Sequence, residues 1–226
     1  MLVGSDGGEH LAIHLEWPVV PPMTPPQRVG LFGGTFDPPH VGHLVTAVGV
    51  RHALDLDVVV LMVANIPWQK VADRAITPAA DRLAMVAAAV DDADGLVAGD
   101  DEIRAGGESY TADTLTALAA RYPGADLFTI VGDDAAAGLL TWRRFDEVVA
   151  ASTMVVVDRP GVQVDLPALP GDAPWCRVEV PHLEVSSTDL RERVSDGRPL
   201  DYLVPPQVLA VIADRGLYGV TRQDQP

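Results

Sequence analysis

Two hydrophobic patterns alternate along the chain from residue 28 onward, and each is typical of a different element. Short, continuous apolar runs rich in β-branched residues indicate buried parallel strands, whereas apolar residues at helical spacing indicate helices. The first pattern predicts strands at 28–32, 57–63, 96–98, 126–131, 153–157 and 176–180. The second predicts helices at 41–54, 78–90, 110–122, 145–150, 188–194 and 205–215. This alternation predicts an α/β fold: a doubly wound parallel sheet, covered on both faces, with a small C-terminal helical part.

The two ends of the chain lack these periodic patterns. Residues 1–27 contain five prolines and predict an extended or mobile leader, followed by one folded domain at 28–220 and a short tail at 221–226. Within the domain, residues 162–174 are rich in Pro, Gly and Asp and predict a loop. Thr77 is the expected N-cap of the helix at 78–90, with Pro78 in its first turn.

The composition fits one ordinary α/β domain and limits the kinds of partner. The chain has 226 residues, of which 48% are hydrophobic, so a full core can form. No apolar run approaches the roughly 20 residues of a membrane-spanning helix, and the N-terminus lacks the pattern of a secretory signal. The single cysteine, Cys176, can form neither an internal disulfide nor a zinc cluster. We therefore expect a cytoplasmic protein with no membrane partner.

The charge balance of the chain is strongly acidic. A net charge of −16 argues against a nucleic-acid partner, because proteins that bind nucleic acids usually present a basic face. A small anionic ligand remains compatible with this charge, since it needs only a few converging cations. Lys70, the lone lysine, is a candidate for such a contact, with a solvated surface lysine as the alternative.

The turn after the first predicted strand carries the strongest chemical signal. Gly33 and Gly34 lie at the carboxyl end of that strand, which is where doubly wound sheets bind their ligands. His40 and His43 follow at the start of a helix, and their spacing places both imidazoles on one face. A helix N-terminus favours phosphate, and two imidazole donors can stabilise charge that develops on a phosphoryl group. A metal-binding pair and structural histidines are the alternatives.

Two segments of the chain match the motifs of a known superfamily. Residues 33–43, with the sequence GGTFDPPHVGH, resemble the (H/T)xGH signature of the nucleotidylyltransferases, in the form found in the bacterial nicotinate-nucleotide adenylyltransferase family. Residues 185–191, with the sequence VSSTDLR, resemble the ISSTxIR motif of the same superfamily. Shorter segments at 108–115, 130–134, 141–142 and 158–161 are also similar to the family. The resemblance implies a Rossmann-like fold and covers most of the chain from residue 28.

The resemblance also implies roles for the matched residues. ATP contacts are implied for Gly33, Gly34, Thr35, Phe36, His40, Gly42, His43, Gly132, Asp134, Ser186, Ser187, Thr188 and Arg191. Catalytic contacts with the phosphates are implied for His40, His43, Lys70 and Arg191. Contacts with the second substrate, a mononucleotide, are implied for Asn65, Lys70, Thr111, Trp142 and Arg159.

Several matched residues have structural alternatives. Ser109 or Thr111 would serve as a simple helix cap, and Trp142 would serve as a packing residue. Arg82 belongs to a segment that resembles the family's Arg-x-x-Met, or it is an ordinary surface arginine. The loop at 68–70 reads Trp-Gln-Lys, where members of the family commonly have Pro-His-Lys.

The reaction that the resemblance implies is an in-line attack by nicotinate mononucleotide on the α-phosphorus of ATP, which gives deamido-NAD and pyrophosphate. The attacking phosphate is already ionised, so no protein nucleophile is needed. We expect Mg²⁺ on the triphosphate, with few protein ligands. The alternatives are a related nucleotidylyltransferase acting on nicotinamide mononucleotide or pantetheine phosphate, and a nucleotide-binding protein without catalysis. The oligomeric state stays open, with a homodimer as one option.

Overall fold

The computed structural model of the protein describes residues 25–67, 76–132, 135–136, 138–158, 174–181 and 183–220. A six-stranded, fully parallel sheet lies at its centre, with the strand order β3-β2-β1-β4-β5-β6. The strands are β1 (Arg28–Gly34), β2 (Val58–Val63), β3 (Leu96–Gly99), β4 (Asp126–Gly132), β5 (Thr153–Asp158) and β6 (Trp175–Glu179). The order reverses between β1 and β4, as in a Rossmann-like doubly wound sheet, so the predicted fold class is confirmed.

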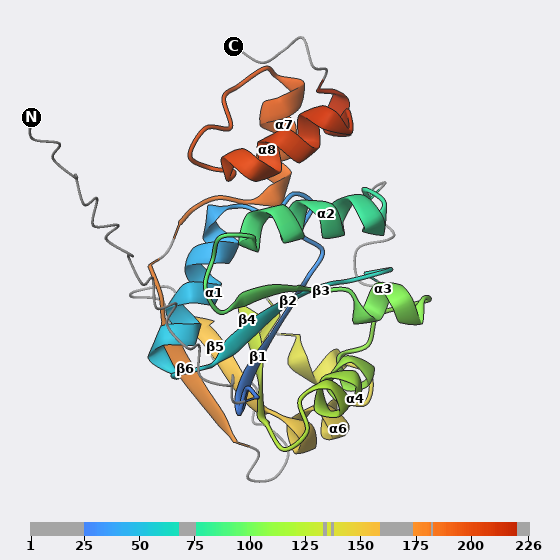
Figure 1. Cartoon of the computed structure of the whole chain (residues 1–226), viewed down its shortest axis with the longest axis vertical. Helices are drawn as coiled ribbons and strands as arrows, with labels where there is room; N and C mark the ends of the chain where they lie inside the picture. The colour runs from blue at the N-terminus through green and yellow to red at the C-terminus, as the bar shows by residue number, and fades with distance from the viewer. Residues whose placement is uncertain are drawn as a thin grey trace, which may run out of the picture.

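Helices cover both faces of this sheet (Figure 1). The longer ones are α1 (Val41–Ala53), α2 (Ala79–Val90), α4 (Thr111–Arg121), α6 (Phe145–Ala151), α7 (Ser187–Ser195) and α8 (Pro206–Asp214). Three shorter ones are α3 (Asp101–Ala105), η1 (Leu139–Thr141) and η2 (Leu217–Gly219). Within the described ranges, no helix has the length and apolar character needed to cross a membrane.

The two faces of the sheet bury two separate apolar clusters. Successive side chains of β2 point to opposite faces, and all six residues of the strand are buried. Val60 and Met62 join the cluster under α4 and α6, whereas Val59 and Leu61 join the cluster under α1 and α2. Burial of such a side chain contributes roughly 1.5–3 kcal/mol. The double coverage explains why the strands carry continuous apolar runs instead of alternating polar and apolar residues.

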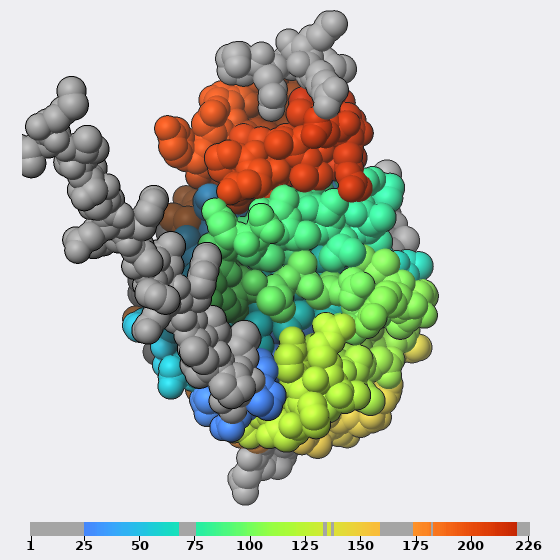
Figure 2. Space-filling model, in the orientation of Figure 1, coloured from blue at the N-terminus to red at the C-terminus, as the bar shows by residue number. Residues whose placement is uncertain are grey.

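The C-terminal helices form a small cap over α2 and add nothing to the sheet. Leu190 of α7 and Val208 and Ile212 of α8 are buried together with Met85 of α2. Figure 2 shows this cap, in orange and red, resting on the green surface that α2 contributes. The cap brings a segment from the end of the chain close to the loops that follow β1 and β2.

Two local features differ from the sequence-based expectations. Pro78 is the N-cap of α2 in place of Thr77, and no side-chain hydrogen bond caps this helix. Thr77 is held elsewhere, because its backbone N–H points to Asp37 and its carbonyl oxygen accepts a hydrogen bond from Arg82. The short helix α3 lies where the hydrophobic pattern predicts no helix, since five residues are too few to display a helical period. Residues 1–24 and 221–226 lie outside the described residues.

Candidate functional site

Two adjoining cavities open at the carboxyl ends of β1 and β4, where the strand order reverses. Doubly wound sheets bind ligands at this position. The larger cavity has a volume of about 720 Å³ and the smaller one of about 390 Å³. The two cavities share the residues at these strand ends, which are Phe32, Gly33, Gly34, Thr35, Gly132 and Ala135. The site therefore has room for two ligand groups side by side.

The β1–α1 turn requires a glycine because of the aromatic ring that follows it. A Cβ atom at Gly34 would lie 2.7 Å from the ring of Phe36, which is closer than carbon atoms approach in proteins. Phe36 has a positive φ of 50° and is 2% exposed. Its ring contacts the His43 ring edge-on, with 4.9 Å between the centroids. The turn is thus supported from below by Phe36, and its glycines leave the backbone accessible from the cavities.

His40 and His43 form a stacked pair at the N-terminus of α1. Their ring centroids lie 3.7 Å apart, with an angle of 28° between the ring planes. His40 is the N-cap residue of α1, and its backbone N–H donates to Nδ1 of His43 at 3.2 Å. Because Nδ1 of His43 accepts this bond, the neutral ring carries its proton on Nε2. Both side chains line the larger cavity, on one face of the helix as the spacing predicts.

Burial determines the charge of His40. Its side chain is 6% exposed, and no described residue forms a hydrogen bond with its Nδ1 atom. Burial lowers the pKa of His40 from 6.5 to about 4, because desolvation disfavours the charged ring. His40 is therefore neutral at pH 7, and it offers a ring N–H as a hydrogen-bond donor without carrying a full charge.

The N-terminal turn of α7 is attached directly to the β1–α1 turn. Ser186 is the N-cap of α7, and its side chain accepts a hydrogen bond from the backbone N–H of Asp189 at 3.2 Å. The hydroxyl of Ser187 donates to the carbonyl oxygen of Pro38 at 2.8 Å. Arg191 donates to the carbonyl oxygen of Asp37 at 2.6 Å and to the hydroxyl of Thr188 at 3.1 Å. Both predicted phosphate motifs therefore lie together around the larger cavity, which all these α7 residues except Asp189 also line.

The carboxylate of Asp37 connects this turn to the C-terminal cap. Asp37 is 1% exposed, and its Oδ1 atom accepts a hydrogen bond from the hydroxyl of Tyr218 in η2 at 2.7 Å. Its Oδ2 atom faces the backbone N–H of Thr77 at 3.4 Å. Burial, followed by the bond to Asp37, raises the pKa of Tyr218 well above its usual value, so the phenol stays protonated and donates.

Arg82 joins the same region from α2. Its side chain is 1% exposed, so the interpretation as a surface arginine is wrong. Its guanidinium donates to three backbone carbonyl oxygens, those of Thr35, Asn65 and Thr77, at 2.8–2.9 Å. Arg82 therefore positions the loops after β1 and β2 relative to one another, and it lines neither cavity.

The smaller cavity lies between the start of α4 and the segment after η1. Thr111 is the first residue of α4, and both Thr111 and Trp142 line the cavity. The N-cap residue is Tyr110 and no side-chain hydrogen bond caps α4, so capping by Ser109 or Thr111 is a wrong prediction. Trp142 also packs against the apolar cluster below the cavity, so the packing interpretation describes part of its environment.

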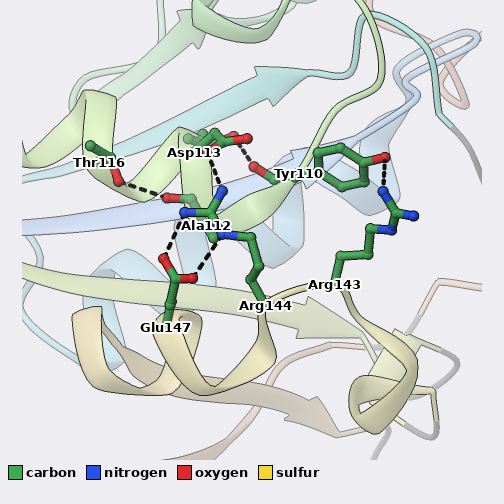
Figure 3. Close-up of polar contacts among 8 residues, drawn as sticks. Tyr110, Ala112, Asp113, Thr116, Arg143, Arg144 and Glu147 are labelled. Carbon is green, nitrogen blue, oxygen red and sulfur yellow. Dashed lines mark hydrogen bonds and ion pairs between the residues drawn. The ribbon is translucent and has the colours of Figure 1, made fainter.

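Ion pairs fix the segment after η1 against α4. Arg144 donates to the carboxylates of Asp113 and Glu147, and the preceding Arg143 donates to the hydroxyl of Tyr110 (Figure 3). Mutual hydrogen bonding with these two carboxylates raises the pKa of Arg144 above its usual value. The segment that carries Trp142 is thus held next to the first turn of α4.

Asn65 connects two loops beside this cavity. Its backbone N–H donates to the hydroxyl of Ser109, and its side-chain amide donates to the carbonyl oxygen of Gly107, both at 2.9 Å. Asn65 lines neither of the two cavities, so its implied substrate contact stays a prediction. Lys70, Asp134 and Arg159 lie outside the described residues, and their implied contacts stay predictions as well.

Sequence reasoning missed several polar residues that border the site. Asp158 is 5% exposed at the end of β5, lines the larger cavity and pairs with Arg177 at 2.6 and 2.8 Å. Arg143 lines the smaller cavity, and the hydroxyl of Tyr218 donates to the carboxylate of Asp37. Asp158 could have been found as an acid at a predicted strand end. Arg143 could have been found as the residue that follows Trp142. No local pattern indicates Tyr218, because tertiary packing alone brings it to Asp37.

Comparisons with known proteins point to one family. The family model described as cytidylyltransferase-like matches residues 31–193. A protein of Mycolicibacterium vanbaalenii named "Probable nicotinate-nucleotide adenylyltransferase" is 43% identical over 199 residues, which cover 85% of this chain and 92% of the relative. A Corynebacterium glutamicum protein of the same name is 42% identical over 201 residues, covering 88% and 91% of the two chains.

Solved structures share the fold of this chain. The nicotinic acid mononucleotide adenylyltransferase of Plasmodium falciparum, described as complexed with NaAD, superposes with a TM-score of 0.68 at 15% identity. The match covers 87% of this chain and 99% of the other. A second structure of that protein, described as complexed with APC, has a TM-score of 0.67 at 14% identity. At these identities, the likeness supports the fold alone.

Proposed function

This chain belongs to the nicotinate-nucleotide adenylyltransferase family, and we propose that it transfers the adenylyl group of ATP to nicotinate mononucleotide, giving deamido-NAD and pyrophosphate in NAD biosynthesis. The observation that carries the proposal is the meeting of the stacked pair of His40 and His43 with Arg191 around one cavity. A second cavity, bordered by Trp142, adjoins it and provides a place for the other substrate.

The reaction that we propose needs positioning and charge stabilisation more than a reactive side chain. A phosphate oxygen of the mononucleotide attacks the α-phosphorus of ATP, a new P–O bond forms, and the bond to the β-phosphate breaks as pyrophosphate leaves in line. Both reactants are anions, so holding them together supplies much of the rate. The attacking oxygen is already ionised, and no proton has to be removed from it.

The larger cavity is assigned to ATP in this proposal. His43 lines this cavity as a donor, with its proton on Nε2, and His40 adds a neutral ring N–H. Arg191 supplies a permanent positive charge from α7, close to Ser187 and Thr188. Donors fixed in this way stabilise the charge that grows on the phosphoryl group without reorganising during the reaction.

The smaller cavity is assigned to the pyridine end of the mononucleotide. The indole of Trp142 offers a flat apolar surface to an aromatic ring, and Thr111 offers a hydroxyl and a backbone N–H at the start of α4. The glycines shared by the two cavities leave space for the phosphates at the junction. In this proposal the two phosphates that react lie beside the β1–α1 turn.

We propose that Mg²⁺ accompanies ATP and is held by the triphosphate oxygens. Mg²⁺ retains several of its waters and binds readily to substrate phosphates, so few protein ligands are needed. The ion would neutralise phosphate charge, and the side chains would bind and orient the phosphates. The need for ATP and the single cysteine support the cytoplasm as the compartment.

The proposal is tested by incubating the protein with ATP, Mg²⁺ and one acceptor, and by measuring pyrophosphate release. We expect release with nicotinate mononucleotide and far less with nicotinamide mononucleotide or pantetheine phosphate. Release with another acceptor alone would assign a different nucleotidylyltransferase activity. ATP binding without release in all three mixtures would favour a non-catalytic nucleotide-binding protein.

Substitution of His43 tests the assigned mechanism. His43→Ala should lower kcat by roughly 100- to 1,000-fold, because a donor to the transition state is lost. His52→Ala, which changes an exposed histidine near the end of the same helix, is the matched control and should leave kcat unchanged. Turnover near the normal rate in His43→Ala would overturn the assignment.

A further inference from the structure

The smaller cavity contains two ionisable groups of opposite charge among its described lining residues, Glu102 and Arg143. The carboxylate of Glu102 accepts a hydrogen bond from the hydroxyl of Thr114 in α4 at 2.5 Å. That bond directs the carboxylate toward a buried residue of the helix. Arg143 therefore contributes the positive charge with which a ligand in this cavity interacts.

The guanidinium of Arg143 is positioned without being neutralised. Its Nη1 atom donates to the hydroxyl of Tyr110 at 3.1 Å, and its Cζ atom lies 5.4 Å from the centroid of the Tyr110 ring (Figure 3). The hydroxyl of Tyr110 donates in turn to the carboxylate of Glu108. In the part of the chain that the structure describes, no carboxylate lies within ion-pair distance of Arg143, and four of its five N–H groups have no partner there.

The neighbouring arginine shows the opposite arrangement. Arg144 makes ion pairs with Asp113 and Glu147, so its charge is balanced within the protein. The pair with Asp113 joins α4 to the start of α6, and the pair with Glu147 lies within the first turn of α6, next to the backbone from which Trp142 and Arg143 extend. Two adjacent arginines thus have distinct functions: one anchors the segment, and the other presents an unbalanced guanidinium to the cavity.

We propose that Arg143 determines specificity by favouring a pyridine mononucleotide that carries a carboxylate over one that carries a carboxamide. The inference rests on the proposed function, because it assumes that the pyridine end enters the smaller cavity. A guanidinium forms strong, charge-assisted and often bidentate hydrogen bonds with a carboxylate. A carboxamide is neutral and gains far less from the same group. Stacking on Trp142 suits either ring, and Thr111 offers only neutral donors, so in this proposal the charge of Arg143 separates the two substrates.

The test compares kcat/KM for nicotinate and nicotinamide mononucleotide, at saturating ATP, between the wild-type protein and Arg143→Gln. We expect Arg143→Gln to lower kcat/KM for the acid about tenfold, the size of one charge-assisted hydrogen bond. For the amide, kcat/KM should stay within about twofold, since hydrogen bonds to a neutral group contribute little here. Arg143→Lys keeps the charge without the planar fork, and it should retain an intermediate preference for the acid.

Arg121→Gln is the matched control. It removes the same charge from the other end of α4, where Arg121 pairs with Asp101 at 2.7 Å and does not line the cavity. The ratio of kcat/KM for the acid to kcat/KM for the amide should be the same in Arg121→Gln as in the wild-type protein. Added NaCl should reduce the preference of the wild-type protein and leave that of Arg143→Gln unchanged, because salt screens a charge at an exposed site.

An equal loss for both substrates in Arg143→Gln, or an unchanged preference, would overturn the role of Arg143. Absence of pyrophosphate release from the wild-type protein with every acceptor would instead overturn the proposed function. In that case calorimetric titration with the two mononucleotides still decides the inference. Tighter binding of the acid than of the amide by the wild-type protein, lost in Arg143→Gln, would support the role of Arg143. Equal binding of the two compounds by the wild-type protein would contradict that role.

Discussion

The protonation of His40 is controlled by the burial of its own side chain. Burial lowers its pKa to about 4, whereas the unfolded chain carries the ordinary value of 6.5. The unfolded state therefore binds a proton more readily, and the free energy of unfolding falls as the pH drops from about 6.5 to about 4, then levels off for this group. We expect His40 to cost about 2–3 kcal/mol of stability between about pH 7.5 and pH 4.5.

Urea unfolding of the wild-type protein and of His40→Gln at the two pH values measures this cost. Glutamine stays neutral, so the loss of stability on acidification should be smaller in His40→Gln by the stated amount. All other ionisable groups are shared by the two proteins, and their contributions cancel. His52→Gln, an exposed control, should behave like the wild-type protein. Equal losses in His40→Gln and the wild-type protein would show that His40 titrates normally in the folded state.

Among the elements, α2, α7 and η2 all form hydrogen bonds with the β1–α1 turn. The most buried of these bonds is the one from Arg82 of α2 to the carbonyl oxygen of Thr35. Replacing Arg82 by methionine keeps much of the side-chain volume but leaves three carbonyl oxygens without their donor. We expect Arg82→Met to lower the free energy of unfolding by about 3 kcal/mol or more, because buried acceptors lose charge-assisted bonds. Arg215→Met is the control, because Arg215 forms an exposed ion pair with Asp81, which lies on α2 next to Arg82. We expect this substitution to change the free energy of unfolding by less than about 1 kcal/mol. Denaturant unfolding distinguishes the two, and similar small losses would contradict the structural role of Arg82.

Features that depend only on neighbouring residues in the chain could be predicted from the sequence. The strands follow from continuous apolar runs, and the pair of His40 and His43 follows from helical spacing, since both depend on neighbours in the chain. The burial of Arg82 could not be predicted, because an arginine on a helix is usually exposed. It is buried here because the loops that contain Thr35, Asn65 and Thr77 surround it. The contact of Tyr218 with Asp37 joins residues 181 positions apart, so no local pattern could indicate it. The two segments proposed to bind phosphate were thus recognisable in the sequence, whereas the residues that hold them in place were not.

At the scale of the whole molecule, the C-terminal cap and the β1–α1 turn form one unit. The cap packs on α2 through an apolar cluster, and it extends one hydroxyl, that of Tyr218, to the buried carboxylate of Asp37. Asp37 also offers its carbonyl oxygen to Arg191. We therefore expect a shift of Asp37 to displace both the turn that carries His40 and the guanidinium of Arg191.

Tyr218→Phe tests this coupling, because phenylalanine preserves the ring in the cap and removes only the hydroxyl. We expect the free energy of unfolding to fall by about 1–2 kcal/mol, since a buried carboxylate loses a donor. We also expect kcat to fall about tenfold, because a small displacement of positioned groups weakens transition-state contacts. Tyr202→Phe is the matched control from the same region, as Tyr202 is 94% exposed and should change neither quantity. A loss of stability in Tyr218→Phe with a normal kcat would contradict the coupling. The bond from Tyr218 to Asp37 would then stabilise the fold without positioning the β1–α1 turn for the reaction.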